Sequence, residues 1–174
     1  MVSQAEYDRL RRAGRWSELE DKLRLEIRDD PSNHWLLTTV ATACHEQRRY
    51  REAKEWSDLA YAIMPECPLV RWDRACIYWS LGDTERAIAF WERLAAATVT
   101  EQQSSPCWES EQWNQALNAD CWHRLAIAYA REGRWSESDA AAARFEEAIA
   151  EGVRSHYTAA ELHDALEKVS RAQS

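Results

Sequence analysis

The chain has 174 residues, of which 45% are hydrophobic and 30% charged, and its formal net charge is −8. A chain of this length and composition can bury a substantial core, which excludes disorder, and its negative charge argues against nucleic-acid binding, because phosphates need a cationic face. Four glycines and four prolines are too few for the frequent turns of a sandwich or barrel, so the composition favours an all-α protein.

Three tight turns repeat one pattern along the chain, and a fourth turn falls in phase with them. The three are Gly14-Arg15-Trp16, Arg48-Arg49-Tyr50 and Gly133-Arg134-Trp135, and the fourth is Gly82-Asp83-Thr84. In chain order the turns are 34, 34 and 51 residues apart, and the last spacing is one period plus 17. A fixed period of this length predicts an array of helical hairpins, in which neighbouring units stack to bury a shared core.

The segments between the turns carry apolar side chains at helical spacing. The first unit, about 1–33, has a short opening helix. The second unit, about 34–67, ends at Pro65, which cannot continue a helix, and the third, about 68–101, opens on Pro68, which suits a first helical turn. The apolar face of the second unit shows the pattern at steps of three or four: Leu37, Val40, Ala41, Cys44, Ala53, Trp56 and Ala60.

Two arginines interrupt this pattern in the third unit. Arg71 and Arg74 occupy positions that would face the core of the hairpin. A buried arginine without a partner costs too much free energy to be expected there. Two explanations stay open: the apolar stems snorkel past the packing toward solvent, or this helix is rotated relative to the others.

An insertion lies between the third unit and the fourth, at about 102–118. Ser105-Pro106 offers an N-cap with proline at the first helical position, which predicts one long helix from about Cys107 to Glu132. Trp108 and Trp113 lie in the first half of this helix, where no core is assigned to them. Either the preceding loop packs on them, or they form an exposed apolar patch through which the chain forms a homodimer.

The end of the chain carries the signals of a capping helix. The fourth unit spans about 119–152 and stops at Gly152, and Thr158-Ala159-Ala160-Glu161 has the spacing of a capping box. One apolar stripe follows, made of Leu162, Ala165, Leu166 and Val169. We therefore expect a helix at about 158–171 that covers the last hydrophobic face of the array.

These patterns resemble the tetratricopeptide repeat (TPR) family. The first helix of its 34-residue repeat has a large apolar residue, Leu, a small residue and Tyr, and the fourth unit matches through Trp122, Leu125, Ala126 and Tyr129 before Gly133. The resemblance implies one all-α domain over 1–174. That domain would be a right-handed superhelix of antiparallel helix hairpins, with an inserted helix extension and a C-terminal capping helix.

In the TPR family, ligands usually lie in a concave groove lined by the first helix of each unit. The matching positions give these candidate partner-binding residues: Trp35, Thr38, Thr42, Trp72, Asp73, Cys76, Trp79, His123, Arg124 and Arg131. The resemblance implies a non-catalytic protein–protein interaction module, an adaptor or scaffold, whose tryptophans anchor a partner segment and whose arginines pair with its carboxylates. Two alternatives stay open: a dedicated chaperone or neutralising partner of one bacterial secreted or toxin protein, and a groove filled by the inserted helix or the cap.

Other function classes lack their signatures in the sequence. No Gly-rich phosphate loop, His-Glu-x-x-His or Gly-x-Ser-x-Gly motif occurs, so we expect neither an enzyme nor a cofactor. Five cysteines without paired spacing indicate reduced core residues and no metal site. The sequence shows no basic leader followed by an apolar run and no long apolar segment, which favours a cytoplasmic protein without a membrane partner.

Overall fold

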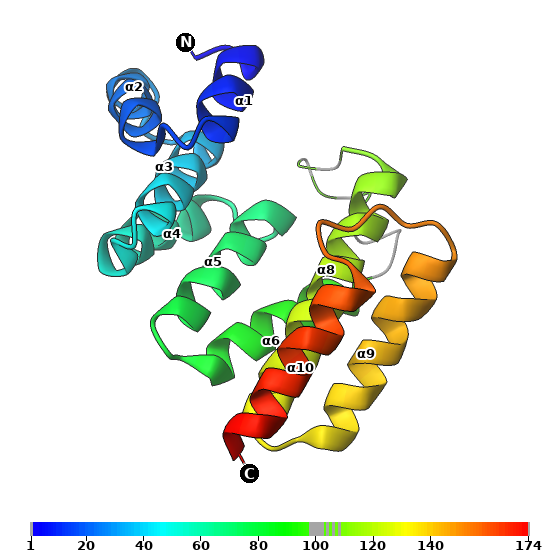
Figure 1. Cartoon of the computed structure of the whole chain (residues 1–174). Coiled ribbons are helices and arrows are strands. Elements are labelled where there is room, and N and C mark those ends of the chain that lie inside the picture. Colours follow the sequence, from blue (N-terminus) through cyan, green and yellow to red (C-terminus); the bar gives the residue numbers. More distant parts are fainter. Residues whose placement is uncertain (1, 98–102, 104, 106, 108, 174) are drawn as a thin grey trace. The chain divides into compact units, whose positions relative to one another are not determined.

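The computed structural model describes residues 2–97, 103, 105, 107 and 109–173. Within these residues the chain is all-helical and contains no strand, which confirms the predicted fold class (Figure 1). None of the helices in these ranges combines the length and the apolar character of a membrane span. In chain order the helices are α1 (Gln4–Arg12), α2 (Trp16–Asp29), α3 (His34–Glu46), α4 (Tyr50–Ile63), α5 (Pro68–Ser80), α6 (Thr84–Ala95), α8 (Glu111–Arg131), α9 (Trp135–Ala150) and α10 (Ala159–Gln173).

Contacts between residues divide the chain into two compact units, Met1–Asp83 and Thr84–Ser174. The first unit contains α1 to α5, and the second contains α6, α8, α9 and α10. The division falls inside the Gly82-Asp83-Thr84 turn, so the two helices of the third predicted hairpin belong to different units. One continuous domain over 1–174 stays a prediction.

Each of the four predicted turns holds a residue with left-handed backbone geometry. The φ angles of Gly14, Gly82 and Gly133 are 64°, 81° and 72°, and that of Arg48 is 61°. The amide of Arg48 donates to the carbonyl of His45, and the next amide donates to the carbonyl of Cys44, both at 2.9 Å. This double hydrogen bond closes the end of a helix and favours glycine, because a Cβ is crowded in this region. Arg48 therefore adopts a conformation that costs it free energy.

The core of the first unit lies where the helices of neighbouring hairpins meet. Trp16 and Trp56 pack against this core, as their sequence positions indicate. The core is built of small and branched side chains that are fully buried: Leu10, Leu19, Leu23, Val40, Ala41, Cys44 and Ala53. Small residues at this seam allow the helices to approach closely.

Arg71 lies inside the first unit, and its charge is partnered there. The side chain is buried, its Nε donates to the carbonyl of Pro65 at 2.7 Å, and its guanidinium pairs with Glu66. Arg71 thus closes the loop between α4 and α5 onto the start of α5.

Arg74 is partnered as well, by aromatic rings and a carboxylate. Its guanidinium lies 4.7 Å from the ring centroid of Tyr61 and 5.2 Å from that of Tyr78, and it contacts Asp58 at 2.6 Å. Cation–π contact and an ion pair together offset the loss of water around the charge. Local partners, rather than snorkelling to solvent, account for both arginines.

In the second unit, α8 begins later than the sequence predicted. The helix starts at Glu111 and not near Cys107, because the side chain of Ser110 accepts a hydrogen bond from the amide of Trp113 at 3.1 Å and caps it. Trp113 is half-buried. Trp108 lies outside the described residues, so a homodimer through these two tryptophans stays a prediction.

The capping box and the last helix form as expected. Thr158 and Glu161 exchange hydrogen bonds, from the Thr158 amide to Glu161 at 2.7 Å and from the Glu161 amide to Thr158 at 3.2 Å. The helix that follows, α10, packs mainly along α8 and also touches α9 (Figure 1). Its Leu162 is fully buried in the second unit.

Candidate functional site

The candidate site is a surface made by one face each of α1, α3 and α5, all in the first unit; we call it the α1/α3/α5 face. Two polar contacts join α3 to α5. The hydroxyl of Thr42 donates to Asp73 Oδ2 at 2.5 Å, and His45 Nε2 lies 2.8 Å from Ser80 Oγ. These contacts place the predicted stripes of the two helices side by side. The stripe of α5 comprises Trp72, Asp73, Cys76, Trp79 and Ser80, and that of α3 comprises Trp35, Thr38, Thr42 and His45.

An aromatic contact extends this face to α1. The ring centroids of Tyr7 and Trp35 lie 5.6 Å apart, with the ring planes tilted by 58°. The charge of Asp73 contributes to a raised pKa of Tyr7, after burial as the largest cause, which places the carboxylate within electrostatic range of the phenol. Helices α1, α3 and α5, each of which is the first helix of its predicted hairpin, thus meet around Asp73.

The predicted residues on this face differ in burial: some pack inside the unit, and others keep part of their surface accessible. Thr38 is buried, and its hydroxyl donates to the carbonyl of His34 at 2.7 Å, so it supports the helix from inside. Trp35, Trp72, Cys76 and Trp79 are half-buried and keep part of their surface accessible. The α1/α3/α5 face therefore presents aromatic side chains on a rigid helical base.

Asp73 is the electrostatic centre of the face. Burial raises the pKa of its carboxyl from the ordinary value of 3.8 to about 7, against the hydrogen bond from Thr42, which lowers it, while the negative charge of Glu46 raises it further. Thr42 binds Oδ2, and no donor in the described parts of the chain reaches Oδ1. Asp73 is thus a carboxylate held in place without a positive neighbour.

In the second unit, the predicted site residue His123 is covered by the chain itself. Its ring stacks on Tyr157, with centroids 4.1 Å apart and planes 7° from parallel, and it meets Phe145 edge-on at 5.2 Å. The side chain of His123 is 4% exposed, and neither ring nitrogen has a hydrogen-bond partner among the described residues. Burial, followed by the charge of Arg124, lowers the pKa of His123 to about 4. It is therefore a neutral packing residue.

Arg124 is engaged by the same tyrosine. Its Nε and Nη2 donate to the Tyr157 hydroxyl at 3.1 and 2.6 Å. Tyr157 belongs to the connection between α9 and α10, residues 153–158, which we call the strap. The strap lies over the α8 positions that the sequence assigned to an open groove.

Asp120 of α8 anchors the strap. This buried carboxylate accepts from the Ser155 hydroxyl at 2.5 Å and from the His156 amide at 3.0 Å, and its other oxygen contacts His156 Nδ1 at 2.7 Å. A buried carboxylate with several donors fixes a loop firmly.

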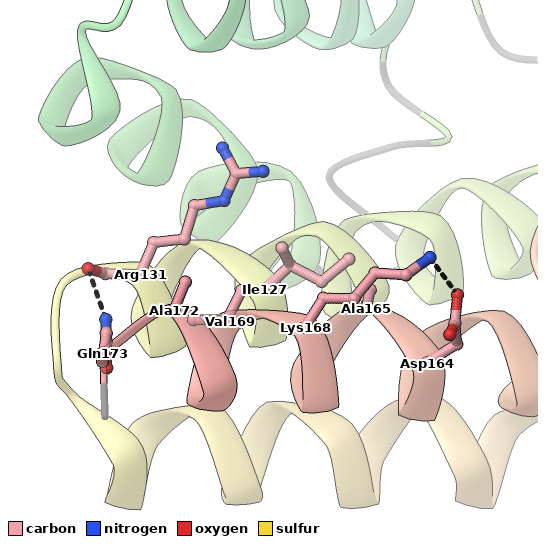
Figure 2. Close-up of a pocket in the computed structure, with 8 residues that line it drawn as sticks. All are labelled: Ile127, Arg131, Asp164, Ala165, Lys168, Val169, Ala172 and Gln173. Carbon is pink, nitrogen blue, oxygen red and sulfur yellow. Dashed lines mark hydrogen bonds and ion pairs between the residues drawn. The ribbon is translucent and has the colours of Figure 1, made fainter.

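Arg131 lines a cavity of about 540 Å³ between α8 and α10, shown in Figure 2. The apolar wall of the cavity comes from Ile127 on α8 and Val169 on α10, while Lys168 at its edge pairs with Asp164 at 2.5 Å. Gln173 closes one end by donating to the carbonyls of Ala130 and Arg131 at 3.0 and 3.1 Å. The last helix thus occupies the α8 surface beside Arg131.

A cluster in the first unit has the residue types of a metal site but a different role. Ligand atoms of Glu20, Cys44 and Glu52 lie within 4.8 Å of one another. Arg49 pairs with both glutamates, and Arg24 pairs with both as well. Burial raises the pKa of Cys44 to about 11, so the thiolate that a metal or a nucleophilic reaction needs is scarce. The cluster is an ion-pair network that joins α2 to α4 and to Arg49, the residue that precedes α4.

Comparison with solved structures finds a relative in fold. The chain superposes on the crystal structure of MamA, a TPR-like helical protein, with a TM-score of 0.59, covering 96% of this chain and 94% of that chain at 14% sequence identity. No protein-family model matches the chain, and no curated protein matches it. Agreement over nearly the full length of both chains, at so low an identity, shows that the chain has a TPR-like helical repeat fold.

Proposed function

We propose that this protein is a non-catalytic interaction module that binds a segment of a partner protein on the α1/α3/α5 face, as an adaptor or scaffold. The observation that carries the proposal is the pair of contacts from Thr42 to Asp73 and from His45 to Ser80. They hold two helices at a fixed register, so that their tryptophans form one surface. A rigid aromatic surface of this kind needs little ordering when a partner binds.

The half-buried tryptophans are the expected anchors. Trp35 lies on α3, and Trp72 and Trp79 lie on α5. Tryptophan dominates interface hot spots because it combines a large apolar area with few rotatable bonds, and truncating such an anchor to alanine costs about 2 kcal/mol or more. Two such losses would lower the affinity on the order of several hundredfold.

His123, Arg124 and Arg131 are left out of the proposed surface. The first two lie against Tyr157, and Arg131 lies beside the last helix. A partner that used them would first have to displace the strap or α10. Cytoplasmic location and a bacterial source remain parts of the proposal that rest on the sequence.

The test is affinity purification from the organism that encodes the chain, using the purified protein as bait. The groove variant is Trp72→Ala/Trp79→Ala, and the matched control is Leu25→Ala/Leu59→Ala, which removes two exposed apolar side chains from α2 and α4. We expect the control to retain the partner and the groove variant, once circular dichroism shows that it is folded, to lose it. If the folded Trp72→Ala/Trp79→Ala variant still retains the partner, the α1/α3/α5 face is not the binding site.

The same experiment separates an adaptor from a dedicated chaperone or neutralising partner. One stoichiometric partner that survives high salt indicates the dedicated role. Several partners that dissociate in salt indicate an adaptor, because weak, charge-dependent contacts are screened.

A further inference from the structure

We infer that the segment bound by the α1/α3/α5 face is cationic and places an arginine or lysine side chain on Asp73. This inference rests on the proposed function and names the chemistry of the partner. It is carried by a contrast between this face and the other places where the chain combines carboxylates with aromatic rings.

At three other places in the described part of the chain, an arginine contacts both an aromatic ring and a carboxylate. Arg24 lies 5.0 Å from the ring centroid of Trp56 and pairs with Glu20 and Glu52. Arg134 lies 4.4 Å from that of Tyr129 and contacts Glu137 at 3.0 Å. Arg74 is held in the same way, by Tyr61, Tyr78 and Asp58. In each of these three places the carboxylate beside the ring thus has a guanidinium partner.

The α1/α3/α5 face has the ring and the carboxylate but no guanidinium on the carboxylate. Thr42 is the one side chain that hydrogen-bonds Asp73 within the described residues, and no lysine or arginine among them forms an ion pair with it. Glu46 adds a second negative charge, and its cationic neighbour within 4 Å is His45, at 3.7 Å and charged only when protonated. The Oδ1 oxygen of Asp73 and the Glu46 carboxylate are therefore available to a cation from outside.

The helix ends add to this negative potential. The last turn of α3 contains His45 but neither lysine nor arginine, and the last turn of α5 contains no basic residue at all. By contrast, the last turns of α1 and α8, which are also first helices of their hairpins, contain arginine. The carboxyl end of a helix carries a partial negative charge of about half a unit, so the end of α3 at Glu46 and the end of α5 at Ser80 favour a cation bound near Glu46.

The positive charges of α1 set one edge of the binding region. Arg11 is exposed and acts on Tyr7, where it opposes the charges of Asp73 and Asp8. A basic segment would therefore lie over α3 and α5 and leave the α1 edge to neutral or acidic residues. This division predicts a partner whose positive charge is local, on one or two side chains, rather than a long basic run.

A displayed library of random dodecapeptides tests the inference on the full-length protein. The wild-type chain, Asp73→Asn/Glu46→Gln and the charge-matched control Asp21→Asn/Glu55→Gln, at exposed positions on α2 and α4, are each used for selection. We expect the wild type and the control to enrich peptides that pair one or two arginines or lysines with apolar residues. Asp73→Asn/Glu46→Gln should bind those peptides at least about tenfold more weakly.

The outcomes distinguish the inference from the proposed function. Enriched peptides that are neutral or acidic, yet lose affinity for Trp72→Ala/Trp79→Ala, would keep the face as the site and refute the cationic partner. Basic peptides that bind equally well to Asp73→Asn/Glu46→Gln would also refute it. Peptides that bind Trp72→Ala/Trp79→Ala unchanged, or no enrichment at all, would count against the proposed function.

Discussion

The hydroxyl of Thr42 donates a hydrogen bond to the carboxylate of Asp73 across 2.5 Å, and this bond joins the middle of α3 to the middle of α5. Both residues come from the stripe that the repeat pattern assigned to the concave side. The bond shows how the face is held together: a short hydroxyl side chain fixes a half-buried carboxylate, and the aromatic side chains lie around it. The Thr42–Asp73 pair therefore joins two helices of the first unit and also lies on the proposed binding surface.

Asp73 makes the stability of the first unit depend on pH. Its folded pKa of about 7 lies above the ordinary value of 3.8, so between these values the folded chain holds a proton that the unfolded chain has released. The free energy of unfolding must then fall as pH rises through this window. We expect Asp73→Asn, which cannot lose a proton, to gain on the order of 1–2 kcal/mol relative to wild type between pH 4 and 7.5.

Urea denaturation of both proteins at several pH values measures this difference. The charge-matched variant Asp21→Asn, at an exposed position, should show no such pH-dependent gain. A constant difference between Asp73→Asn and wild type across the window would contradict a raised pKa.

His123, in the second unit, makes the free energy of unfolding depend on pH in the opposite direction. Its folded pKa of about 4 lies below the ordinary 6.5, so the unfolded chain binds a proton first as pH falls. Stability contributed by the neutral ring is present above pH 6.5 and is lost toward pH 4. His123→Phe keeps a flat ring against Tyr157 but does not titrate. We expect wild type to lose on the order of 2 kcal/mol relative to this variant over that range.

Thermal unfolding of wild type and His123→Phe at pH 7 and at pH 4.5 provides the comparison. Asp73 contributes the same pH dependence of stability to both proteins. The difference between their stabilities therefore reports on His123 alone. Equal losses in both proteins on acidification would show that His123 is accessible to protons in the folded state.

The repeat pattern in the sequence predicts the helices well, for a physical reason. Turns, caps and apolar stripes are local signals, and the Thr158–Glu161 capping box and the left-handed turns form as their spacing indicates. The surroundings of Arg71 and Arg74 could not be predicted in this way, because their partners come from α4 and the loop after it. Periodicity shows which way a side chain points but not what it meets.

Two predicted site residues of the second unit show the same limit of prediction from periodicity. His123 and Arg124 occupy groove positions in the repeat pattern, yet Tyr157 covers them from 33 or more residues later in the chain. An aromatic residue between Gly152 and the capping box was the available signal, and its destination depended on tertiary packing. That the predicted residues of the α1/α3/α5 face bind a partner stays a prediction.

Asp120 should control the order of the strap. Asp120→Asn keeps the shape of the side chain but removes the charge and replaces one acceptor oxygen with a donor, which faces either the Ser155 hydroxyl and the His156 amide or the His156 ring. We expect amide exchange in residues 153–158 to become about tenfold or more faster, since losing one charged hydrogen bond costs about 1.5–3 kcal/mol.

Hydrogen–deuterium exchange with mass spectrometry measures this effect. Peptides from α1 to α4 provide the internal reference, since they belong to the other unit. Unchanged exchange in the strap would show that the Tyr157 contacts alone hold it.

Arg48 should limit the stability of the second turn. It adopts a left-handed φ of 61°, where the three equivalent turns have glycine. Relief of this conformation outweighs the greater chain entropy of glycine, so Arg48→Gly should stabilise the protein by about 0.5–1 kcal/mol. Arg51→Gly, at an exposed position inside α4, serves as the contrasting control and should destabilise it. Loss of stability in Arg48→Gly, measured by urea denaturation, would contradict strain at this turn.

The most direct test of the account maps contact between the α1/α3/α5 face and its partner. A photo-crosslinking phenylalanine derivative replaces Trp72 or Trp79 in turn, and Leu25 on the exposed side of α2 is the control position. After irradiation in a lysate of the source organism, we predict that both α5 positions crosslink to the same segment of the same protein and that Leu25 does not. Crosslinks from Leu25 alone, or unrelated products from Trp72 and Trp79, would show that this face is not the binding surface.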